Sequence, residues 1–312
     1  MSNNLLITGI NGFVGTNLYN NLKDSFNIYG IDVCEDQSKH NCTFYSWDDF
    51  DSIPSADVII HLAGKAHDTS NTADESQYFE INVGLTKNIF EHFLNSSARK
   101  FIFFSSVKAV ADDVTQNSLI EDVAPNPATP YGKSKLEAEN YLLSRTLPPN
   151  KQIYIFRPAM IHGPGNKGNL NLLYSFVENS IPYPLGAFKN FRSYASIDNL
   201  LYIITRVIEE EIQPGTYNIC DDDPLSTTEV VSIIYDTLEK KRRILSIPKQ
   251  IIQAIAHVGD YLHIPINSER LKKMTESYVI SNVKIKNALG IKTLPVSAHS
   301  GMVVTIKSFL DN

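Results

Sequence analysis

Tyr131 and Lys135, four positions apart, are of residue types that can move a proton in a reaction. Pro130 suits the first turn of a helix, and on a helix the two side chains would share one face. A nearby ammonium group favours the phenolate and lowers the pKa of a tyrosine, so the phenol could act as a general acid or base near neutral pH. The same spacing is common in solvated helices, so the interpretation depends on the surrounding motifs.

A glycine-rich loop follows the first apolar run of the chain. Gly9, Gly12 and Gly15 stand between that run and a helical pattern. Glycines let the backbone approach a pyrophosphate, and the start of the helix offers free N–H groups. Asp32 ends the next predicted strand, where a carboxylate accepts hydrogen bonds from ribose hydroxyls and repels the extra phosphate of NADP. These residues predict an NAD site, whereas the alternative is a set of ordinary turns.

Two serines, Ser105 and Ser106, follow a predicted strand over 100–104. The carboxyl ends of parallel strands meet at one edge of a sheet, where ligands bind. The serines should therefore lie on the same edge as the glycine loop. Ser106 could hydrogen-bond a sugar hydroxyl or a keto oxygen there, while the alternative is that both serines only close a turn.

The elements that must position these residues are predicted by hydrophobic patterning. Apolar runs alternate with helical patterns in the first half of the chain, which indicates a parallel sheet with helices on both faces. Strands are predicted over 5–8, 27–31, 57–61, 100–104, 152–156 and 216–220. Helices are predicted over 14–23, 75–94, 131–143, 170–178, 197–210 and 227–238. We therefore predict an α/β fold, with a Rossmann-type doubly wound parallel sheet in 1–160 and a smaller mixed substrate-binding lobe in 161–312. A further crossing of the chain between the two lobes stays open.

Composition and charge exclude several classes of protein. Hydrophobic residues make up 43% of the chain, which suits a globular core, and the net charge of −6 gives no general reason to bind nucleic acid. The basic run at 240–243 is interpreted as a solvated helix end rather than a phosphate-binding patch. Cys34, Cys42 and Cys220 predict free thiols and no metal site. No basic leader and no apolar run near the ~20 residues of a membrane span are present, so we expect a cytoplasmic protein with no membrane partner.

With these motifs together, the sequence resembles the extended short-chain dehydrogenase/reductase family, and within it the NAD-dependent nucleotide-sugar epimerases and dehydratases. The glycine loop matches T-G-x-x-G-x-x-G, the Tyr131–Lys135 pair matches Y-x-x-x-K, and Ser106 matches the active-site serine. Further segments that match family motifs are His61-Leu62-Ala63-Gly64, Asn82-Val83-Gly84-Leu85-Thr86, Arg157 to Gly165 and Arg192 to Asn199.

The resemblance also implies a set of site residues. The catalytic residues would be Tyr131, Lys135 and Ser106. The cofactor-binding residues would be Gly9, Asn11, Gly12, Phe13, Val14, Gly15, Asp32, Leu62, Ala63, Gly64, Asn82, Ser105, Tyr131, Lys135 and Pro158. The substrate-binding residues would be Lys108, Asn169 and Arg192, with Arg192 on the nucleotide diphosphate.

Some positions depart from the family pattern. Lys108 follows the serines where many epimerases have a small residue, and it resembles the S-S-[VI]-K stretch of reductases that act on 4-keto-6-deoxy-N-acetylhexosamine nucleotides. Dehydratases carry additional acid and base groups at this point, so Val107 and Lys108 argue against 4,6-dehydratase activity. His162 replaces a tyrosine and is interpreted as a packing or hydrogen-bonding residue rather than a catalytic one.

The resemblance implies an NAD-dependent 4-epimerase of a UDP-hexose or UDP-N-acetylhexosamine. Tyr131 would take the proton of the sugar C4 hydroxyl while the hydride passes to NAD, and the 4-keto sugar would be reduced again on its other face. One alternative is an NAD(P)H-dependent 4-ketoreductase of a nucleotide-linked 4-keto-6-deoxyhexosamine. Another, from a different class, is a catalytically silent dinucleotide-binding sensor. A homodimer through helices such as 75–94 and 131–143 is expected.

Overall fold

The computed structural model describes residues 4–33, 41–48, 52–65, 74–114, 118–166, 169–262 and 267–310, without the side chains of residues 169 and 262. Cys34 lies outside the described residues, whereas Cys42 and Cys220 are free thiols.

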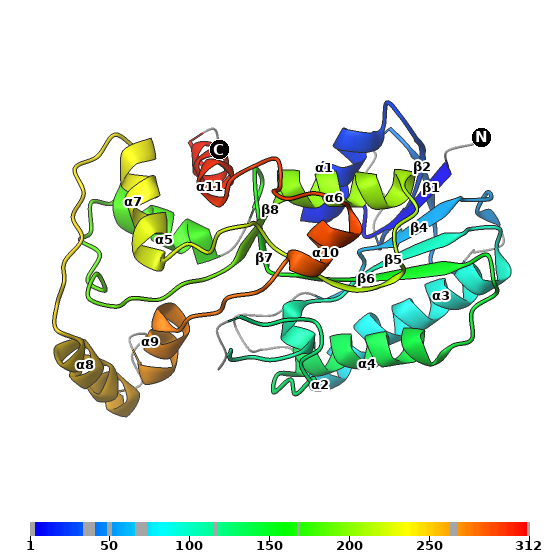
Figure 1. The fold of residues 1–312 in the computed structure, drawn as a ribbon. Coiled ribbons are helices and arrows are strands. Elements are labelled where there is room, and N and C mark those ends of the chain that lie inside the picture. The colour runs from blue at the N-terminus through cyan, green and yellow to red at the C-terminus, as the bar shows by residue number, and fades with distance from the viewer. Residues whose placement is uncertain are drawn as a thin grey trace.

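A seven-stranded sheet forms the centre of the molecule (Figure 1). Its strands lie in the order β3-β2-β1-β4-β5-β6-β9, and every neighbouring pair is parallel. The strands are β1 (Asn4–Thr8), β2 (Asn27–Ile31), β3 (Thr43–Tyr45), β4 (Val58–His61), β5 (Lys100–Phe104), β6 (Gln152–Pro158) and β9 (Gly215–Ile219). All the strands predicted from the sequence are present. The order reverses between β1 and β4, which is the point where open sheets of this kind bind ligands.

Helices cover both faces of the sheet because alternate strand side chains point to opposite faces. Leu5 and Ile7 pack with α1 and α6, whereas Leu6 packs with α3 and α4. These helices are α1 (Phe13–Leu22), α3 (Leu85–Asn95), α4 (Pro130–Ser144) and α6 (Ile197–Glu209). Figure 1 shows the two helix layers on opposite sides of the strands. Burial on both faces explains the apolar strand sequences and confirms the predicted Rossmann-type fold.

The helix predicted over 75–94 is present but interrupted. It consists of α2 (Glu75–Phe79), a π-helical turn η2 (Glu80–Gly84), and α3. The Thr86 hydroxyl, from the start of α3, donates to the carbonyl of Asn82 in this turn at 2.6 Å. The side chain of Asn82 is fully buried there. A π-helical turn inside an α-helix is often found at a functional site.

The chain crosses back into the sheet after residue 161. Strand β9 pairs with β6, and α6 packs on the same face as α1, so both belong to the sheet layer. The remaining elements are β7 (Met160–His162), β8 (Tyr194–Ser196), α5 (Asn169–Glu178), α7 (Thr227–Thr237), α8 (Lys249–Leu262), α9 (Ser268–Thr275), α10 (Val283–Ala288) and α11 (Ala298–Lys307). Strands β7 and β8 form a separate parallel pair, and α5, α7 and α11 share a second hydrophobic core.

Candidate active site

The glycine loop joins β1 to α1 and has room only for glycine at two positions. Gly9 has a φ of +72°, and a Cβ added to it would lie 2.7 Å from the backbone nitrogen of Ala63. A Cβ on Gly15 would lie 2.4 Å from the carbonyl oxygen of Gly9. Helix α1 begins after Gly12 with no side-chain cap and no acidic residue in its first turn. This helix start therefore fits the diphosphate of a dinucleotide. Asn11, Phe13 and Val14, also predicted to bind the cofactor, lie in the same turn.

Asp32 follows β2 at the same edge of the sheet. Its carboxylate accepts hydrogen bonds from the backbone N–H groups of Asn11 and Val33, both at 2.8 Å. The acidic residue is thus tied to the glycine loop that it was predicted to accompany. A carboxylate in this place fits the ribose of NAD and disfavours a 2′-phosphate.

A second loop, Leu62 to Lys65, follows β4 and lies beside the glycine loop. The Ala63 N–H donates to the Thr8 hydroxyl at 3.2 Å. A Cβ on Gly64 would lie 2.8 Å from Asn82 Oδ1 and 3.1 Å from Lys135 Nζ. The predicted cofactor residues Leu62, Ala63 and Gly64 therefore lie between the phosphate loop and the predicted catalytic lysine.

Asn82 connects this second loop to helix α4. Its Oδ1 accepts from the backbone N–H of Lys65 at 2.7 Å, and its Nδ2 donates to the Ser134 hydroxyl at 2.9 Å. Ser134 in turn donates to the carbonyl of Tyr131 at 2.8 Å. The π-helical turn thus places an amide where it holds both the cofactor loop and the first turn of α4.

A buried chain of hydrogen bonds runs behind the loop through His61. The Thr8 hydroxyl lies 2.6 Å from His61 Nδ1, and His61 Nε2 lies 3.0 Å from the Thr86 hydroxyl. The Thr86 hydroxyl donates its proton to the Asn82 carbonyl, so it can only accept from His61. His61 must therefore donate through Nε2 and accept from Thr8 through Nδ1. Burial, and then the charge of Lys135, lower the pKa of His61 to about 3. The sequence placed His61 in a family motif but did not reveal this link between β1 and α3.

Tyr131 is the second residue of α4, after a cap in which the Thr129 hydroxyl accepts from the Gly132 N–H at 3.2 Å. A hydrogen bond joins its hydroxyl to that of Ser106. Burial raises the pKa of Tyr131 above its ordinary value, and the bond to Ser106 opposes this shift by less. The pKa direction expected from the Tyr–Lys spacing was therefore wrong, because the cost of burying a phenolate exceeds the other effects.

Lys135 lies one turn further along α4, buried behind β5. Its Nζ donates to the carbonyl of Phe104, the last residue of β5, at 2.9 Å. Burial lowers the pKa of Lys135 to about 8, and the carboxylate of Glu139 opposes the shift. The structure thus places Tyr131, Lys135 and Ser106 near the carboxyl end of β5.

Ser105 and Ser106 have different partners. The Ser106 hydroxyl caps a short 3₁₀ turn, η3 (Val107–Ala109), and contacts Tyr131. The Ser105 hydroxyl instead donates to the buried carboxylate of Glu139. Glu139 also forms an ion pair with Arg157, with the closest nitrogen and oxygen 2.6 Å apart. The Ser105 side chain is therefore part of a buried polar cluster that ties α4 to β6, a cluster that the sequence did not predict.

The predicted substrate residues Lys108 and Arg192 lie on the side of the smaller lobe. Lys108 Nζ lies 4.4 Å from the ring centroid of Tyr278, whose hydroxyl donates to the carbonyl of Ala111 at 2.6 Å. Burial lowers the pKa of Lys108, the charge of Asp112 opposes this shift, and the charge of Arg192 adds to it. The Arg192 guanidinium donates to the carbonyls of Lys273 and Glu276 at the end of α9.

Two other predicted residues give less information. Pro158 is the buried last residue of β6 and lies opposite Ile219 of β9. Asn169 begins α5, but its side chain lies outside the described part of the chain. His162, which was not expected to be catalytic, is buried with its Nδ1 2.8 Å from the Thr305 hydroxyl. Among the residues described, no three His, Cys, Asp or Glu side chains are grouped so that they could hold a metal ion.

None of the helices described is long and apolar enough to cross a membrane.

The fold and this edge of the sheet define a dinucleotide-binding protein of the Rossmann type. The model of the NAD dependent epimerase/dehydratase family matches residues 5–220, so the chain belongs to that family of enzymes. Both the family predicted from the sequence and NAD as its cofactor are confirmed.

Individual relatives are more distant but match along almost the full chain. The chain is 27% identical to a UDP-glucose 4-epimerase of Vibrio cholerae, over 99% of this chain and 96% of that protein. It is 26% identical to an N-acetyl-α-D-glucosaminyl-diphospho-ditrans,octacis-undecaprenol 4-epimerase of Escherichia coli O157:H7, over 92% and 85% of the two chains. The crystal structure of the Bordetella bronchiseptica enzyme WbmG with NAD superposes with a TM-score of 0.77 at 16% identity, over 99% and 94% of the chains.

Proposed function

We propose that the protein is an NAD-dependent 4-epimerase of a nucleotide-linked hexose or N-acetylhexosamine, with a UDP-sugar as the first candidate. The hydrogen bond between Tyr131 and Ser106 carries this proposal, because it puts a proton donor and a proton acceptor at the ligand-binding edge of the sheet. The 4-epimerases among the relatives support the choice of reaction.

In the proposed mechanism Tyr131 removes the proton of the sugar C4 hydroxyl. Its raised pKa makes the neutral phenol the resting form, so Tyr131 must first release its own proton to solvent. The positive charge of Lys135 on the same helix face would favour the phenolate, which then accepts the C4 proton. Ser106 donates a hydrogen bond to the sugar oxygen as it becomes a ketone and holds that oxygen in place. NAD, held by the glycine loop and Asp32, supplies the hydride chemistry. Tyr131 returns the proton when the sugar is reduced on its other face.

We propose further that Lys108 and Arg192 bind the diphosphate side of the substrate. Both contact Tyr278, Lys108 over its ring and Arg192 through a backbone bridge, and this supports the role because two cations on one side of a site can attract a doubly charged group. Arg192 would have to exchange its bonds to the end of α9 for bonds to phosphate oxygens. Asn169 stays a prediction for the same pocket.

The second candidate is a 4-ketoreductase in the same site. Lys108 favours it, because a cation next to Ser106 can stabilise negative charge on a keto oxygen. Asp32, bonded to the glycine loop, disfavours a reductase that requires NADPH. A 4-ketoreductase would consume reduced cofactor in proportion to its product, whereas an epimerase returns its hydride.

Incubation with UDP-glucose and UDP-N-acetylglucosamine, without added cofactor, tests the proposal. We expect conversion of each sugar to its C4 epimer, which chromatography or NMR would detect. Conversion only of a 4-keto sugar, with stoichiometric NADH or NADPH oxidation, would establish the reductase instead. Binding of NAD without turnover of any substrate would leave only a dinucleotide sensor.

We also propose a homodimer through α3 and α4, where Leu143 is one of the exposed large apolar side chains. Light scattering during gel filtration tests this, with Leu143→Glu expected to shift the protein toward the monomer. If the unsubstituted protein had the mass of a single chain, the homodimer would be contradicted. The cytoplasmic location stays a prediction.

A further inference from the structure

Helix α8 carries a row of large apolar side chains on its solvent side. This row, the α8 stripe, consists of Ile251, Ile255, Val258 and Tyr261, which are 51%, 46%, 56% and 90% exposed. Spacings of four, three and three residues place them along one side of the helix. On the adjoining side Ile252 and Ala256 are buried against the protein. Helix α8 is thus attached by one face and presents a second apolar face to its surroundings.

Exposed apolar side chains are concentrated in this part of the molecule. Of the sixteen large ones among the described residues, six lie within 240–275: Leu245, Ile251, Ile255, Val258, Tyr261 and Met274. Single exposed hydrophobic residues are normal on a protein surface, but a group of them marks a surface that contacts another apolar phase or partner.

The same segment is basic, in contrast to the rest of the chain. Residues 240–275 contain eight Lys or Arg and two Asp or Glu, a net charge of +6, whereas the whole chain carries −6. Asp236 and Asp113, from outside the segment, pair with Arg242 and Lys272. Exposed positive charge is present at Lys241, Arg243 and Lys249 as well. An apolar stripe next to positive charge matches the chemistry of an anionic lipid surface.

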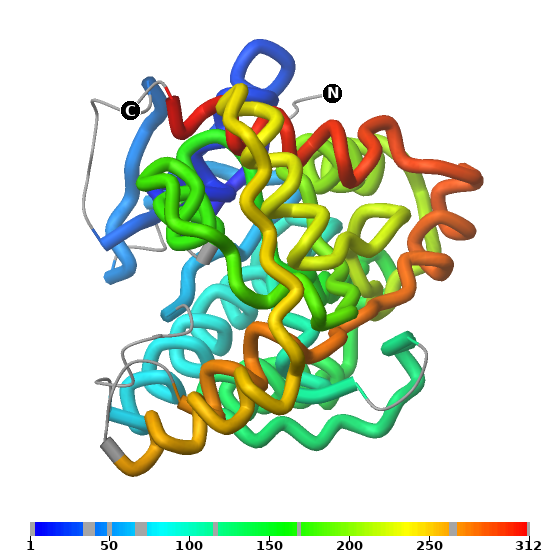
Figure 2. Tube along the Cα trace, turned by 90° about the vertical axis from the view of Figure 1, so that its left-hand side faces the viewer, coloured from blue at the N-terminus to red at the C-terminus, as the bar shows by residue number. Residues whose placement is uncertain are grey.

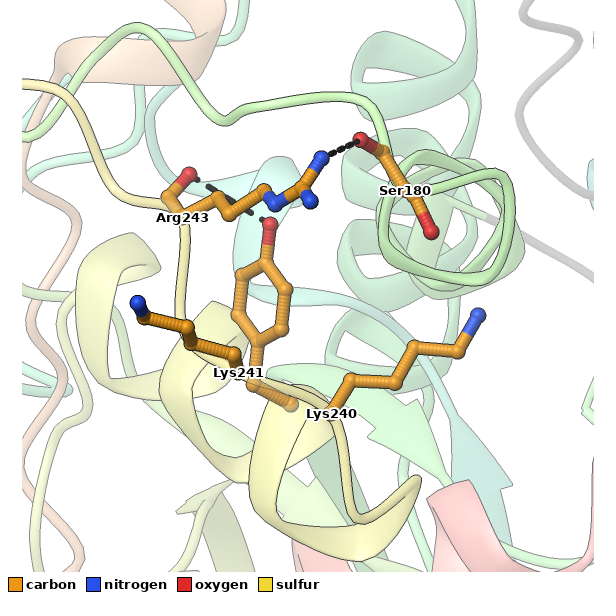
Figure 3. Close-up of a pocket in the computed structure, with 5 residues that line it drawn as sticks. Ser180, Lys240, Lys241 and Arg243 are labelled. Atoms are coloured by element: carbon orange, nitrogen blue, oxygen red, sulfur yellow. Dashed lines mark hydrogen bonds between the residues drawn. The ribbon is translucent and has the colours of Figure 1, made fainter.

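The cations at the start of the segment do not form a single anion site. They line a pocket of about 160 Å³ together with two hydroxyl side chains; the lining residues are Ser180, Tyr235, Lys240, Lys241 and Arg243. Figure 3 shows that the side chains of Lys240 and Lys241 point away from each other. Lys240 donates instead to the carbonyl of Glu178. Their positive charge is therefore spread over the surface, which suits attraction to the many headgroups of an anionic lipid membrane.

The segment 240–248 and helix α8 lie on one side of the molecule (Figure 2). Figure 2 shows the segment 240–248 running down this side to α8, with α9 next to it. Asp260 of α8 accepts from the N–H of Ser268 in α9 at 2.9 Å, and Arg192 holds the other end of α9. Helix α9 therefore contacts both α8 and the predicted substrate residue Arg192.

We propose that the α8 stripe and the basic segment 240–249 dock the protein on an anionic phospholipid membrane, with α8 lying in the headgroup layer. Docking in this way needs one apolar helix face and nearby cations, not a spanning segment. A second copy of the chain is disfavoured as the partner, because two such basic faces would repel each other. The proposal replaces the expectation of no membrane partner, which rested on the absence of a basic leader and of a long apolar run. It does not depend on the sugar that the enzyme uses.

Flotation of the full chain with lipid vesicles tests the proposal. We expect the protein to float with vesicles of phosphatidylcholine and phosphatidylglycerol but not with phosphatidylcholine alone, and to be released by high salt. The double substitution Ile255→Glu/Val258→Glu should lower the bound-to-free ratio by about tenfold or more, because it removes the apolar face. Lys241→Glu/Arg243→Glu should lower it by about tenfold, because it reverses two charges near the surface.

Val283→Glu is the matched control, since Val283 is 55% exposed on α10, outside the segment. It should float like the unchanged protein. Thermal unfolding of each variant shows that it is folded, so lost flotation reports lost docking. No flotation of the unchanged protein, or equal flotation of the Ile255/Val258 variant, would overturn the proposal. A dimer that only the Ile255/Val258 variant breaks, without vesicle binding, would assign the face to a second copy and overturn it as well.

Discussion

The hydroxyl of Thr8 lies 2.6 Å from Nδ1 of His61, inside the protein and directly behind the glycine loop. This contact fixes His61 as a neutral ring that joins β1 to α3. Protonation of the ring would reverse the bond to Thr8, because Nδ1 would lose its acceptor lone pair and the hydroxyl would have to accept instead of donate.

The first prediction concerns the stability of the protein in acid. The pKa of His61 is lowered from 6.5 to about 3 in the folded protein, so below the unfolded value the unfolded chain binds the extra proton. Stability is therefore lost as the pH falls from about 6.5 toward 3, by up to a few kcal/mol. Chemical unfolding at a series of pH values should show a weaker acid dependence in His61→Gln. Identical slopes for the two proteins would contradict the neutral buried ring.

Gly15 and Gly84 make a matched pair for the glycine loop. Gly15→Ala should weaken NAD binding and destabilise the fold by about 1–3 kcal/mol, because the new Cβ meets backbone atoms at 2.4 Å. Gly84 is helical, and a Cβ added to it would have no neighbouring atom within 4 Å, so Gly84→Ala should stabilise by about 0.4–1 kcal/mol. Calorimetric NAD titration and thermal unfolding measure both. Equal NAD affinities in the two variants would show that the loop does not hold the cofactor.

Substitutions of the neighbouring serines Ser106 and Ser105 should have different effects, the first on catalysis and the second on stability. Ser106→Ala removes the partner of Tyr131 and should lower kcat by about a hundredfold, with little effect on the unfolding temperature. Ser105→Ala removes a donor from the buried Glu139 carboxylate and should destabilise by about 1–3 kcal/mol. Steady-state kinetics and thermal unfolding of the two variants check this contrast. If Ser106→Ala kept full kcat, Ser106 would have no role in the reaction.

The lowered pKa of Lys135 predicts that activity is lost at alkaline pH. Its pKa of about 8 means that the ammonium is neutralised as the pH rises through that value, and kcat/KM should fall with it. The sign for stability is opposite: between about 8 and the ordinary 10.5 the unfolded chain binds more protons, so stability from this group rises with pH. Lys135→Arg keeps its charge at these pH values, so any activity that this variant retains should not decrease as the pH rises above about 8. A flat profile for the unchanged protein would contradict the role of the ammonium.

Much of the fold could be predicted because burial on both faces leaves a direct pattern in the sequence. The β5 run Lys100–Phe104 is buried on both faces, and its bounds were predicted correctly. The spacing of Tyr131 and Lys135 also placed them correctly on one helix, α4, where residues four apart share a face. Short strands such as β3 and the marginal helix α9 carry too few apolar residues to be recognised in this way.

The features that were missed depend on contacts between distant parts of the chain. The pKa of Tyr131 rises because surrounding segments bury it, which residue spacing does not encode. The Ser105 side chain turns to Glu139 rather than to the crevice because Arg157, on another strand, holds that carboxylate. The apolar residues of α8 gave no functional signal, because only the structure shows which of them remain exposed.

The central claim is that Tyr131 moves the proton of the sugar while the glycine loop holds NAD independently. Calorimetric NAD binding and turnover of UDP-sugars by Tyr131→Phe, measured on the same preparation, test it most directly. We expect NAD affinity close to that of the unchanged protein and a loss of turnover of about 10²–10⁴-fold or more. A variant that retained full turnover would contradict the claim.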